Sequence, residues 1–431
     1  MRGFEMSVDY FDRFISGFIS YGSLTVIRPD GRSQTYGAAK EPHVAVKIHD
    51  RKTERRLLLR PSLAVGEAYT DGNLTIESGN LRDLLDILLK SQRNAFPKGV
   101  WGSFKRKMKT ARFYPEMFNN ISRSRRNVQH HYDIGNDLYK LFLDQDMQYS
   151  CAYFREPNLS LEEAQFEKKE HLAKKLLLKP GMHVLDIGSG WGGLGLHLAR
   201  HYGVRVTGVT LSKEQHAASV RRAAEMGLSG LVNFEIQDYR ETAGQYDRIV
   251  SVGMFEHIGR PFFNEFFQHM SRLLKDDGVA VLHTIARMTP PEPINIWIHR
   301  YIFPGGYLPS LSELAPILEK LGLMLTDFEN WRLHYAETLR HWDARFQKHR
   351  REVTALYDER FCRMWELYLQ SCERSFEHQG LCVFQLQLAK SMDAVPLTRD
   401  YMYRPVETME LPGVAVIGPA HSTQAARHVA R

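Results

Sequence analysis

The clearest chemical pattern in this chain is a series of glycines that follows a carboxylate. The segment His183-Val-Leu-Asp-Ile-Gly-Ser-Gly-Trp-Gly-Gly193 places Gly188, Gly190 and Gly192 at every second position after Asp186. The apolar run before the glycines is typical of a buried parallel strand, and glycines let the next turn bring its backbone against a ligand. The segment therefore predicts a ligand-binding turn between a strand and a helix.

The spacing of these glycines separates two kinds of ligand. A dinucleotide site has the pattern G-x-G-x-x-G and an acidic residue about twenty positions further on. This chain has D-x-G-x-G-x-G instead, and Thr210 rather than a carboxylate stands at that distance from Gly190. The pattern favours an S-adenosylmethionine pocket over an NAD site, and an incidental glycine-rich turn is the structural alternative.

The elements after the glycines alternate between strand and helix. Apolar strands are predicted over residues 204–209, 232–237, 246–252 and 278–284, with helical stretches over 191–201, 213–226, 262–274 and 312–321. Such alternation predicts an α/β fold, a Rossmann-like doubly wound sheet that binds its ligand at the carboxyl edge. Asp186, Thr210, Asp238 and Glu256 all lie at or just past a strand's carboxyl end, so they are expected to share one site.

Composition describes the setting of this sheet. The chain has 431 residues, 43% of them hydrophobic and 25% charged, as in an ordinary globular protein. It has no apolar run of 18 residues and no signal-peptide core, so neither a membrane span nor secretion is expected. The four cysteines, Cys151, Cys362, Cys372 and Cys382, form neither a disulfide framework nor metal-ligand spacing. We expect a cytoplasmic protein without a metal.

A small α+β domain is predicted over residues 1–95. Short alternating runs at 23–28 and 43–49 and an apolar helix at 81–89 support it, and none of its residues has catalytic spacing. The catalytic domain is expected over 127–390. Its region 336–388 is predicted to be long-helical and rich in aromatic residues, and 391–431 to be an extended tail.

A basic segment with interspersed aromatic residues joins the two domains, over residues 96–126. Residues 98–126 contain nine basic residues and one acidic residue, a net charge of +8, in a chain whose net charge is +7. Three interpretations remain open: docking on an anionic lipid surface, binding of RNA phosphates, or a solvated linker. An Asn-or-Asp-Pro-Pro-aromatic motif is missing after the fourth strand, which disfavours amino-group methylation of a flipped base.

From about residue 115 to 390, several blocks together resemble the cyclopropane-fatty-acyl-phospholipid synthase family, which includes the mycolic acid cyclopropane synthases. Besides the glycine segment, the blocks are His131–Tyr139, Gln148–Phe154, Gly208–Gln215, Ser251–Gly259, Leu282–Ile285, Tyr301–Ser310, Tyr335–Leu339 and Met364–Leu369. They occur in order and with sensible spacing. Residues 1–95 resemble, more weakly, the small lipid-contacting domain of the phospholipid-acting members.

The resemblance implies a set of residues that hold S-adenosylmethionine. They are Tyr149, Ser150, Leu185, Asp186, Ile187, Gly188, Ser189, Gly190, Trp191, Gly192, Gly193, Thr210, Leu211, Ser212, Gln215, Asp238 and Tyr239. Thr210 and Gln215 would bond the ribose in place of the usual acid. Ser212 to Gln215 also has the spacing of a helix capping box, which is the structural alternative for Gln215.

The resemblance also implies a bound bicarbonate that acts as the base in the reaction. The matching holders are Cys151, Glu256, His283 and Tyr335, with the backbone of Ile285. Each has an ordinary structural alternative: a buried cysteine, a helix-cap partner, a core histidine and a core aromatic residue. Cys372 also matches a family cysteine and ranks below Cys151, because direct methyl transfer to an alkene needs no covalent enzyme intermediate.

The expected activity is transfer of a methylene from S-adenosylmethionine to unsaturated acyl chains of phospholipids by a peripheral membrane enzyme. The nearest alternative stops at C-methylation of the acyl chain, and Tyr307, where some synthases have cysteine, leaves the placement of the substrate open. A lipid-binding or transfer protein with an inactive catalytic domain is an alternative of another class. No nucleic-acid partner is expected, and a homodimer is left open.

The charge of the 98–126 segment generates a testable prediction. Replacing Lys105, Arg106 and Lys107 with glutamine should weaken binding to anionic vesicles by about 3 kcal/mol at low salt, because each cation near the headgroups contributes about 1 kcal/mol. Added salt should reduce the difference. Vesicle sedimentation measures the binding, and activity on detergent-dispersed lipid serves as the control. Equal binding of the two proteins at low salt would leave the segment as a linker.

Overall fold

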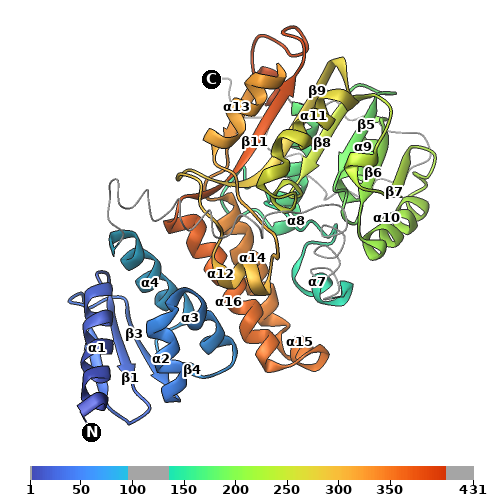
Figure 1. Cartoon of the computed structure of the whole chain (residues 1–431). Helices are drawn as coiled ribbons and strands as arrows, with labels where there is room; N and C mark the ends of the chain where they lie inside the picture. The colour runs from blue at the N-terminus through green and yellow to red at the C-terminus, as the bar shows by residue number, and fades with distance from the viewer. Residues whose placement is uncertain (1, 96–134, 404–431) are drawn as a thin grey trace, which may run out of the picture.

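The computed structural model describes residues 2–95 and 135–403, and the expected basic segment at 96–126 lies outside these residues. The first part of the chain forms a small α+β unit (Figure 1). Its helices are α1 (Arg2–Phe18), α2 (Arg51–Leu59), α3 (Pro61–Thr70) and α4 (Leu81–Ala95). Its strands β1 (Ser23–Ile27), β2 (Ser33–Tyr36), β3 (His43–Ile48) and β4 (Leu74–Ser78) form a sheet of order β2-β1-β3-β4.

Strict alternation of side chains gives this small sheet one buried face. In β3, Val44, Val46 and Ile48 are buried while the residues between them are partly or fully exposed. Helix α4 covers β1 and β3, and its Ile87 is fully buried. The expected α+β fold of this region is therefore confirmed.

The second part of the chain is built on a seven-stranded sheet of order β10-β11-β9-β8-β5-β6-β7. The five expected strands are present as β5 (His183–Ile187), β6 (Arg205–Thr210), β7 (Val232–Ile236), β8 (Tyr246–Val252) and β9 (Leu274–Arg287). They are mutually parallel, and the chain order reverses between β5 and its neighbour β8. This arrangement confirms the doubly wound α/β fold, whose ligand sites lie where the order reverses.

Two further strands correct the prediction for the C-terminal region. Strands β10 (Met324–Asn330) and β11 (Leu381–Ala389) complete the sheet, and β11 pairs antiparallel with both β10 and β9. The expectation of helix through residue 388 was wrong, because the last helix ends at His378 and Gly380 turns the chain with a φ of 72°. Strand β11 is buried on both faces, Gln385 and Gln387 included, so it lacks the alternation that marks a half-exposed strand.

Helices cover both faces of the large sheet (Figure 1). One face carries α8 (Leu161–Lys175), α9 (Gly193–Tyr202) and α10 (Lys213–Glu225), and the other carries α11 (Phe263–Leu273) and α13 (Leu311–Leu321). The remaining helices are α7 (Asn136–Phe142), α12 (Ile296–Tyr301), α14 (His334–Lys348), α15 (Arg350–Leu356) and α16 (Glu359–His378). The short 3-10 turns are Tyr239–Glu241, Phe255–His257, Arg260–Phe262 and Asp400–Met402. Residues 391–403 are not an extended tail, since Met402 is buried and the Tyr401 hydroxyl bonds Gln387.

The N-terminal unit shares a hydrophobic core with α12, α14 and α16. Polar contacts reinforce this junction: Arg82 on α4 pairs with Asp343 on α14 and, at 3.0 Å, with Glu373 on α16, and both carboxylates are buried. Gly66 on α3 lies so close to Trp297 on α12 that a Cβ would meet the indole at 2.4 Å. The junction is therefore packed at atomic contact rather than bridged by solvent.

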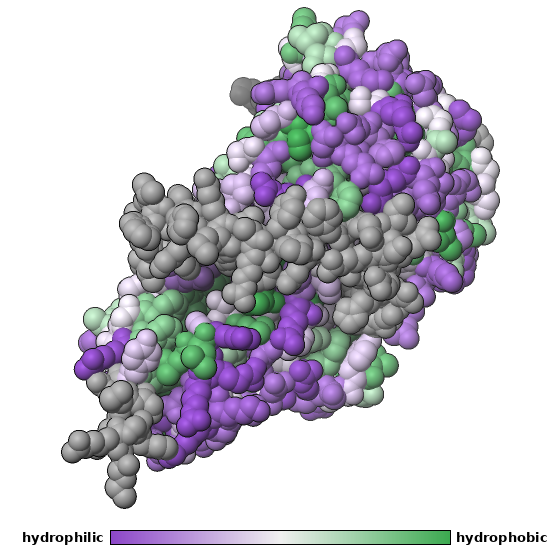
Figure 2. Space-filling view, viewed as in Figure 1, coloured by the Kyte–Doolittle hydropathy of each residue, from purple (hydrophilic) through white to green (hydrophobic). Residues whose placement is uncertain are grey.

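No described helix is long and apolar enough to cross a bilayer. Figure 2 shows hydrophobic residues in small groups among hydrophilic ones on the face in view.

Candidate active site

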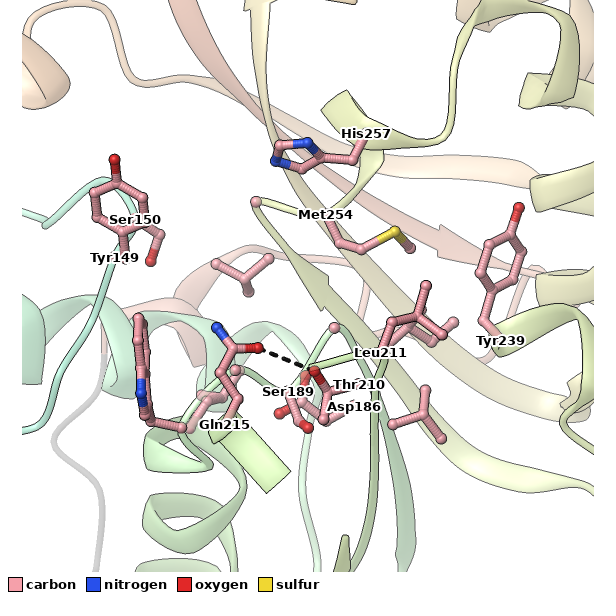
Figure 3. Close-up of a pocket in the computed structure, with 18 of the residues that line it drawn as sticks. Tyr149, Ser150, Asp186, Ser189, Thr210, Leu211, Gln215, Tyr239, Met254 and His257 are labelled. Carbon is pink, nitrogen blue, oxygen red and sulfur yellow. Dashed lines mark hydrogen bonds between the residues drawn. The ribbon is translucent and has the colours of Figure 1, made fainter. Parts of the chain in front are cut away.

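A pocket lies at the carboxyl edge of the large sheet, at the point where the strand order reverses. Its walls come from the ends of β5, β6, β7 and β8 and from the segment 147–150 before α8. The cavity has a volume of about 1220 Å³, part of it continuous with solvent. Figure 3 shows Tyr149 and Ser150 on one side of it, Tyr239 on the opposite side, His257 and Met254 above, and Asp186, Ser189 and Thr210 below. The pocket therefore lies where the alternation of strands and helices predicted it.

The three alternating glycines serve different structural needs. All three have positive φ, a conformation that favours glycine. A Cβ on Gly188 would lie 2.7 Å from Met254, and one on Gly192 would lie 2.7 Å from Phe234 and Ser219. A Cβ on Gly190 would meet no protein atom within 4 Å, and Gly190 lines the pocket. Gly190 is therefore the glycine whose missing side chain leaves room for a ligand.

Most of the predicted cofactor-binding residues line this pocket. They are Tyr149, Ser150, Asp186, Ile187, Gly188, Ser189, Gly190, Trp191, Gly193, Thr210, Leu211, Gln215, Asp238 and Tyr239. Three others do not line it. Leu185 is fully buried in a hydrophobic cluster, Gly192 packs against Phe234, and Ser212 caps α10 by accepting from the Gln215 backbone at 3.2 Å.

Gln215 uses its side chain toward the pocket rather than in a capping box. Its Oε1 accepts a hydrogen bond from the Thr210 hydroxyl at 3.0 Å, and Figure 3 shows its amide nitrogen directed into the cavity. Ser212 caps the helix alone, through its Oγ. The geometry thus leaves the Gln215 amide as a donor at the ligand edge.

The end of β7 contributes an ion pair as well as pocket surface. Asp238 is buried and binds Arg240 through both of its oxygens, at 2.8 and 2.7 Å. The ring of Tyr239 packs against Phe266 at 5.4 Å between centroids. The Asp238 carboxylate is therefore already occupied, and the pocket gains the adjoining backbone and Arg240.

Several buried polar atoms around the pocket have no protein partner. Among the described residues they include Asp186 Oδ2, Ser189 Oγ and the Tyr239 hydroxyl. Burial raises the pKa of the Asp186 carboxyl to about 7. A buried polar atom without a partner costs about 1–3 kcal/mol. A ligand with ammonium, hydroxyl and ring-nitrogen groups would satisfy these atoms, and S-adenosylmethionine has all three.

A second group of polar residues lies behind one end of the pocket. Cys151 follows the pocket-lining Ser150 and is buried, and burial raises the pKa of its thiol far above the usual range. Glu256 lies between the pocket-lining Met254 and His257 and accepts from the Ile285 backbone at 2.5 Å. Its other oxygen has no partner among the described residues, and burial raises the pKa of the carboxyl to about 7. Glu256 is therefore not a simple helix cap.

His283 is held in one tautomer. The Gln385 amide lies 3.0 Å from its Nδ1, and an amide nitrogen can only donate. The neutral ring therefore carries its proton on Nε2. Burial lowers the pKa of His283 well below its usual value, so the ring stays neutral. His283 is thus a fixed hydrogen-bond donor.

Tyr335 and Cys372 meet the pocket through an aromatic cluster. Tyr335 packs against Trp342, whose ring stacks on the pocket-lining Tyr149 at 5.1 Å. The Tyr149 hydroxyl lies 2.7 Å from that of Tyr368 on α16. Burial, and then the nearby Tyr149, Cys372 and Tyr335, raise the pKa of Tyr368 well above 10. Burial also raises the pKa of the Cys372 thiol to about 12, which makes it a poor nucleophile at neutral pH.

Sequence reasoning missed part of the pocket lining. The missed residues include Met147, Gln148, Gln237, Arg240, Gly253, Met254 and His257. Their positions adjoin predicted site residues, so proximity along the chain was the available signal. Among the described residues, no cluster of His, Cys, Asp or Glu has the geometry of a metal site.

The open space at Gly190 generates a prediction. The change Gly190→Val should abolish binding of S-adenosylhomocysteine, because the side chain would enter the cavity. Gly227→Val is the matched control, since Gly227 also has positive φ and open space but does not line the pocket. Calorimetric titration measures both. Unchanged affinity in the Gly190 variant would show that the ligand lies elsewhere.

The raised pKa of Asp186 generates a second prediction. The ammonium group of the ligand favours the ionised carboxylate, so binding releases a proton whenever Asp186 starts protonated. With a free-protein pKa of about 7, affinity for S-adenosylhomocysteine should rise about tenfold from pH 6 to pH 8. Asp186→Asn should remove this rise. Asp247→Asn is the control and should keep the rise, because Asp247 lies at the amino end of β8 and does not line the pocket. A rise in affinity that survives in Asp186→Asn would refute the assignment.

Comparison with known proteins places the chain. The family model described as mycolic acid cyclopropane synthetase matches residues 119–386, and a domain of unknown function matches residues 17–99. Cyclopropane-fatty-acyl-phospholipid synthase of Escherichia coli is 38% identical over 79% of this chain and 86% of its own length. Tuberculostearic acid methyltransferase UfaA1 of Mycobacterium tuberculosis is 35% identical over 85% of this chain and 88% of its own.

A solved structure agrees with the sequence comparisons. Mycolic acid cyclopropane synthase CmaA1, complexed with S-adenosylhomocysteine and CTAB, is 34% identical with a TM-score of 0.59. The match covers 61% of this chain and 97% of that one. The fold is that of an S-adenosylmethionine-dependent methyltransferase, and the chain belongs to the mycolic acid cyclopropane synthetase family, as the order and spacing of its sequence blocks had indicated.

Proposed function

We propose that this protein transfers a methylene group from S-adenosylmethionine to the cis double bond of unsaturated acyl chains in phospholipids. The observation that carries the proposal is the pairing of two features in one site. Among the described residues, several buried polar atoms of the ligand pocket have no hydrogen-bond partner, and neither does one oxygen of Glu256, which lies behind the pocket. The named activity of the Escherichia coli relative supports the substrate class.

The chemistry explains why a dry site is needed. S-adenosylmethionine supplies an electrophilic methyl group on a sulfonium. When an alkene takes this methyl, one C–S bond breaks, one C–C bond forms and a carbocation is left on the acyl chain. A proton must then leave the added methyl group so that the second C–C bond can close the ring. Water near the cation would intercept it, so the site must exclude water.

The residues of this chain exclude water with a buried aromatic cluster. Tyr139, Phe142, Trp342 and Trp365 are all fully buried, and each lies within 6.4 Å, between ring centroids, of another member of the cluster. Their rings enclose Tyr149, whose hydroxyl is held by Tyr368. This cluster shields the side of the pocket formed by the Tyr149–Cys151 segment.

We infer that a bicarbonate is held by Cys151, Glu256, His283 and Tyr335. Bicarbonate supplies a proton acceptor at the cation. His283 carries its proton on Nε2 and has a hydrogen to donate to an anion. Cys151 remains a neutral thiol whose Sγ donates to the Ala152 carbonyl at 3.3 Å, and it would exchange this hydrogen bond for one to the anion. Glu256, whose pKa is raised to about 7, can hold a proton on its partnerless oxygen at neutral pH. The donor set fits an oxyanion.

Two finer features complete the proposal. The protein acts as a peripheral protein at the cytoplasmic side of an anionic membrane, supported by the charge of +8 over residues 98–126. Analytical sedimentation would show whether the protein forms a homodimer. The substrates are acyl chains of membrane lipids, with no nucleic acid involved.

C-methylation of the acyl chain is the second candidate. The relative from Mycobacterium tuberculosis is named a methyltransferase, and the match covers 85% of this chain and 88% of the relative. Tyr307, where some synthases have cysteine, is fully buried; its hydroxyl donates to Glu313 at 2.8 Å and its backbone donates to the Glu256 carbonyl at 2.9 Å. Tyr307 therefore contacts Glu256 directly, so the residue at this position can affect whether the reaction closes the ring or stops at methylation.

One experiment separates these activities. The protein is incubated with vesicles of monounsaturated phospholipid and S-adenosylmethionine, and the acyl chains are analysed by mass and gas chromatography against standards. A gain of one CH2 with loss of the double bond indicates a cyclopropane, and the same gain with a double bond retained indicates methylation. No gain would favour a lipid-binding protein without catalysis and would overturn the proposal.

The position of Glu256 generates a prediction about turnover. Glu256→Gln should reduce turnover by at least about a hundredfold, the usual scale when proton-transfer chemistry is lost, because Glu256 helps to hold the bicarbonate that accepts the proton. Affinity for S-adenosylhomocysteine should stay nearly unchanged, since Glu256 does not line the cofactor pocket. Glu319→Gln, on the exposed side of α13, is the control. Near-normal turnover in the Glu256 variant would reduce Glu256 to a structural role.

A further inference from the structure

Lys168 on α8 is a fully buried lysine that the proposed reaction does not use. Its Nζ donates to Gln148 Oε1 at 2.6 Å and to Ser150 Oγ at 2.8 Å. Both partners are uncharged, and both line the cofactor pocket. Within the described residues, no carboxylate forms an ion pair with Lys168, in contrast to its neighbour Lys169, which pairs with Asp146 at 2.5 Å.

The segment that Lys168 holds carries residues of both halves of the site. Residues 148–151 include Tyr149 and Ser150 of the cofactor pocket and Cys151 of the anion site. Gln165, one turn before Lys168, donates its amide to the carbonyls of Gln148 and Ser150 at 3.3 and 2.9 Å. Two side chains of α8 therefore hold this short segment, the uncharged Gln165 and the charged Lys168.

The charge is what needs an explanation. Burying an ammonium costs several kcal/mol, and Asp144 and Asp146, which lie near Lys168 without forming an ion pair with it, offset only part of that cost. Gln165 already holds the backbone of the segment, and a methionine would fill the volume of Lys168 without that cost. A buried cation beside a pocket is stabilised when an anion enters the pocket.

We propose that Lys168 is a positioning residue whose ammonium provides the counter-charge for a carboxylate-type oxyanion bound in the pocket. Two ligands carry this chemistry, the amino-acid carboxylate of the cofactor and bicarbonate. The proposal rests on the proposed function, because both ligands belong to it. Lys168 acts through Ser150 and Gln148, which its hydrogen bonds orient.

The charged and titratable groups around Lys168 come from three elements besides its own. They are Asp144, Asp146 and Cys151 on the preceding segment, Lys169 on α8, Asp186 on β5 and His283 on β9. Burial lowers the pKa of Lys168 to about 8, with the nearby aspartates opposing the change. An oxyanion in the pocket favours the charged form, so binding should take up a proton above about pH 8.

The first test compares two ligands and two isosteric variants. S-adenosylhomocysteine has the amino-acid carboxylate, and 5′-methylthioadenosine lacks it. If Lys168 balances that carboxylate, Lys168→Met should weaken S-adenosylhomocysteine at least about tenfold in calorimetry, as expected for a buried ionic partner. The affinity of this variant for 5′-methylthioadenosine should stay within about twofold of the wild-type value. Gln165→Met, which removes a fastening contact without changing charge, should affect both ligands equally.

The second arm identifies bicarbonate as the source. If bicarbonate is the oxyanion, it should raise the unfolding temperature of the wild type but not of Lys168→Met, and both adenosine ligands should behave alike. Two results together would overturn the proposal. Lys168→Met and Gln165→Met would affect binding of the two adenosine ligands in the same way, and bicarbonate would stabilise Lys168→Met as much as the wild type. A wild type that binds no S-adenosylhomocysteine would instead contradict the proposed function.

A third measurement needs no variant. Affinity of the wild type for S-adenosylhomocysteine, or its stabilisation by bicarbonate, should fall as the pH rises from 8 to 10, because deprotonated Lys168 offers no counter-charge. The fall should be smaller for decarboxylated S-adenosylhomocysteine without bicarbonate, because this ligand keeps the ammonium that pairs with Asp186 and lacks only the carboxylate. Identical pH profiles above pH 8 for all three would refute the role of Lys168 even if the methionine variant fails to fold.

Discussion

The active site depends on polar groups that burial has left with too few partners. Asp186 Oδ2, Ser189 Oγ, the Tyr239 hydroxyl and Glu256 Oε2 are each buried without a hydrogen bond from a described residue. Each such atom costs free energy in the empty protein, about 1–3 kcal/mol. The fold tolerates this cost because two hydrophobic clusters, one on each face of the sheet, fix the strands that carry these residues. The cost is recovered only when ligands with complementary groups enter.

The position of β5 explains why these atoms surround one cavity. Strand β5 pairs in parallel with β6 on one side and with β8 on the other. The chain therefore leaves the sheet in opposite directions from β5 and β8, and the loops that follow them separate. The first loop carries the glycines and the second carries Glu256, so the glycine turn and the Glu256 carboxyl lie at neighbouring strand ends on the two sides of a single gap. The segment 148–151 covers that gap, fastened by α8.

The sequence predicted those features that depend on local pattern. Five parallel strands and the pocket at their carboxyl ends followed from apolar runs punctuated by glycine and polar residues, and the structure places Asp186, Thr210 and Asp238 together there. Strand β11 could not be predicted, because a strand buried on both faces with two internal glutamines resembles the end of an amphipathic helix. Lys168 was also missed, since its helix presents lysines at several positions. Lys169 and Lys175 are buried as well, and among these three described lysines Lys168 alone lacks an ion pair. Burial of polar residues is a property of the assembled fold, and no periodicity records it.

Buried ion pairs hold the N-terminal unit against the catalytic helices. Asp343 and Glu373 are buried in the catalytic part, and Arg82, which binds both, comes from the N-terminal unit. Separating the two parts would take this cation from both carboxylates. Glu373 would keep Arg340 and Arg374, but the buried Asp343 would be left with the amides of Gln347 and Gln370, which is costly for a buried charge. The position of one part relative to the other is therefore fixed by side-chain contacts and not by the covalent connection. A chain cleaved between residues 96 and 134 is therefore expected to remain a single particle with its catalytic geometry unchanged.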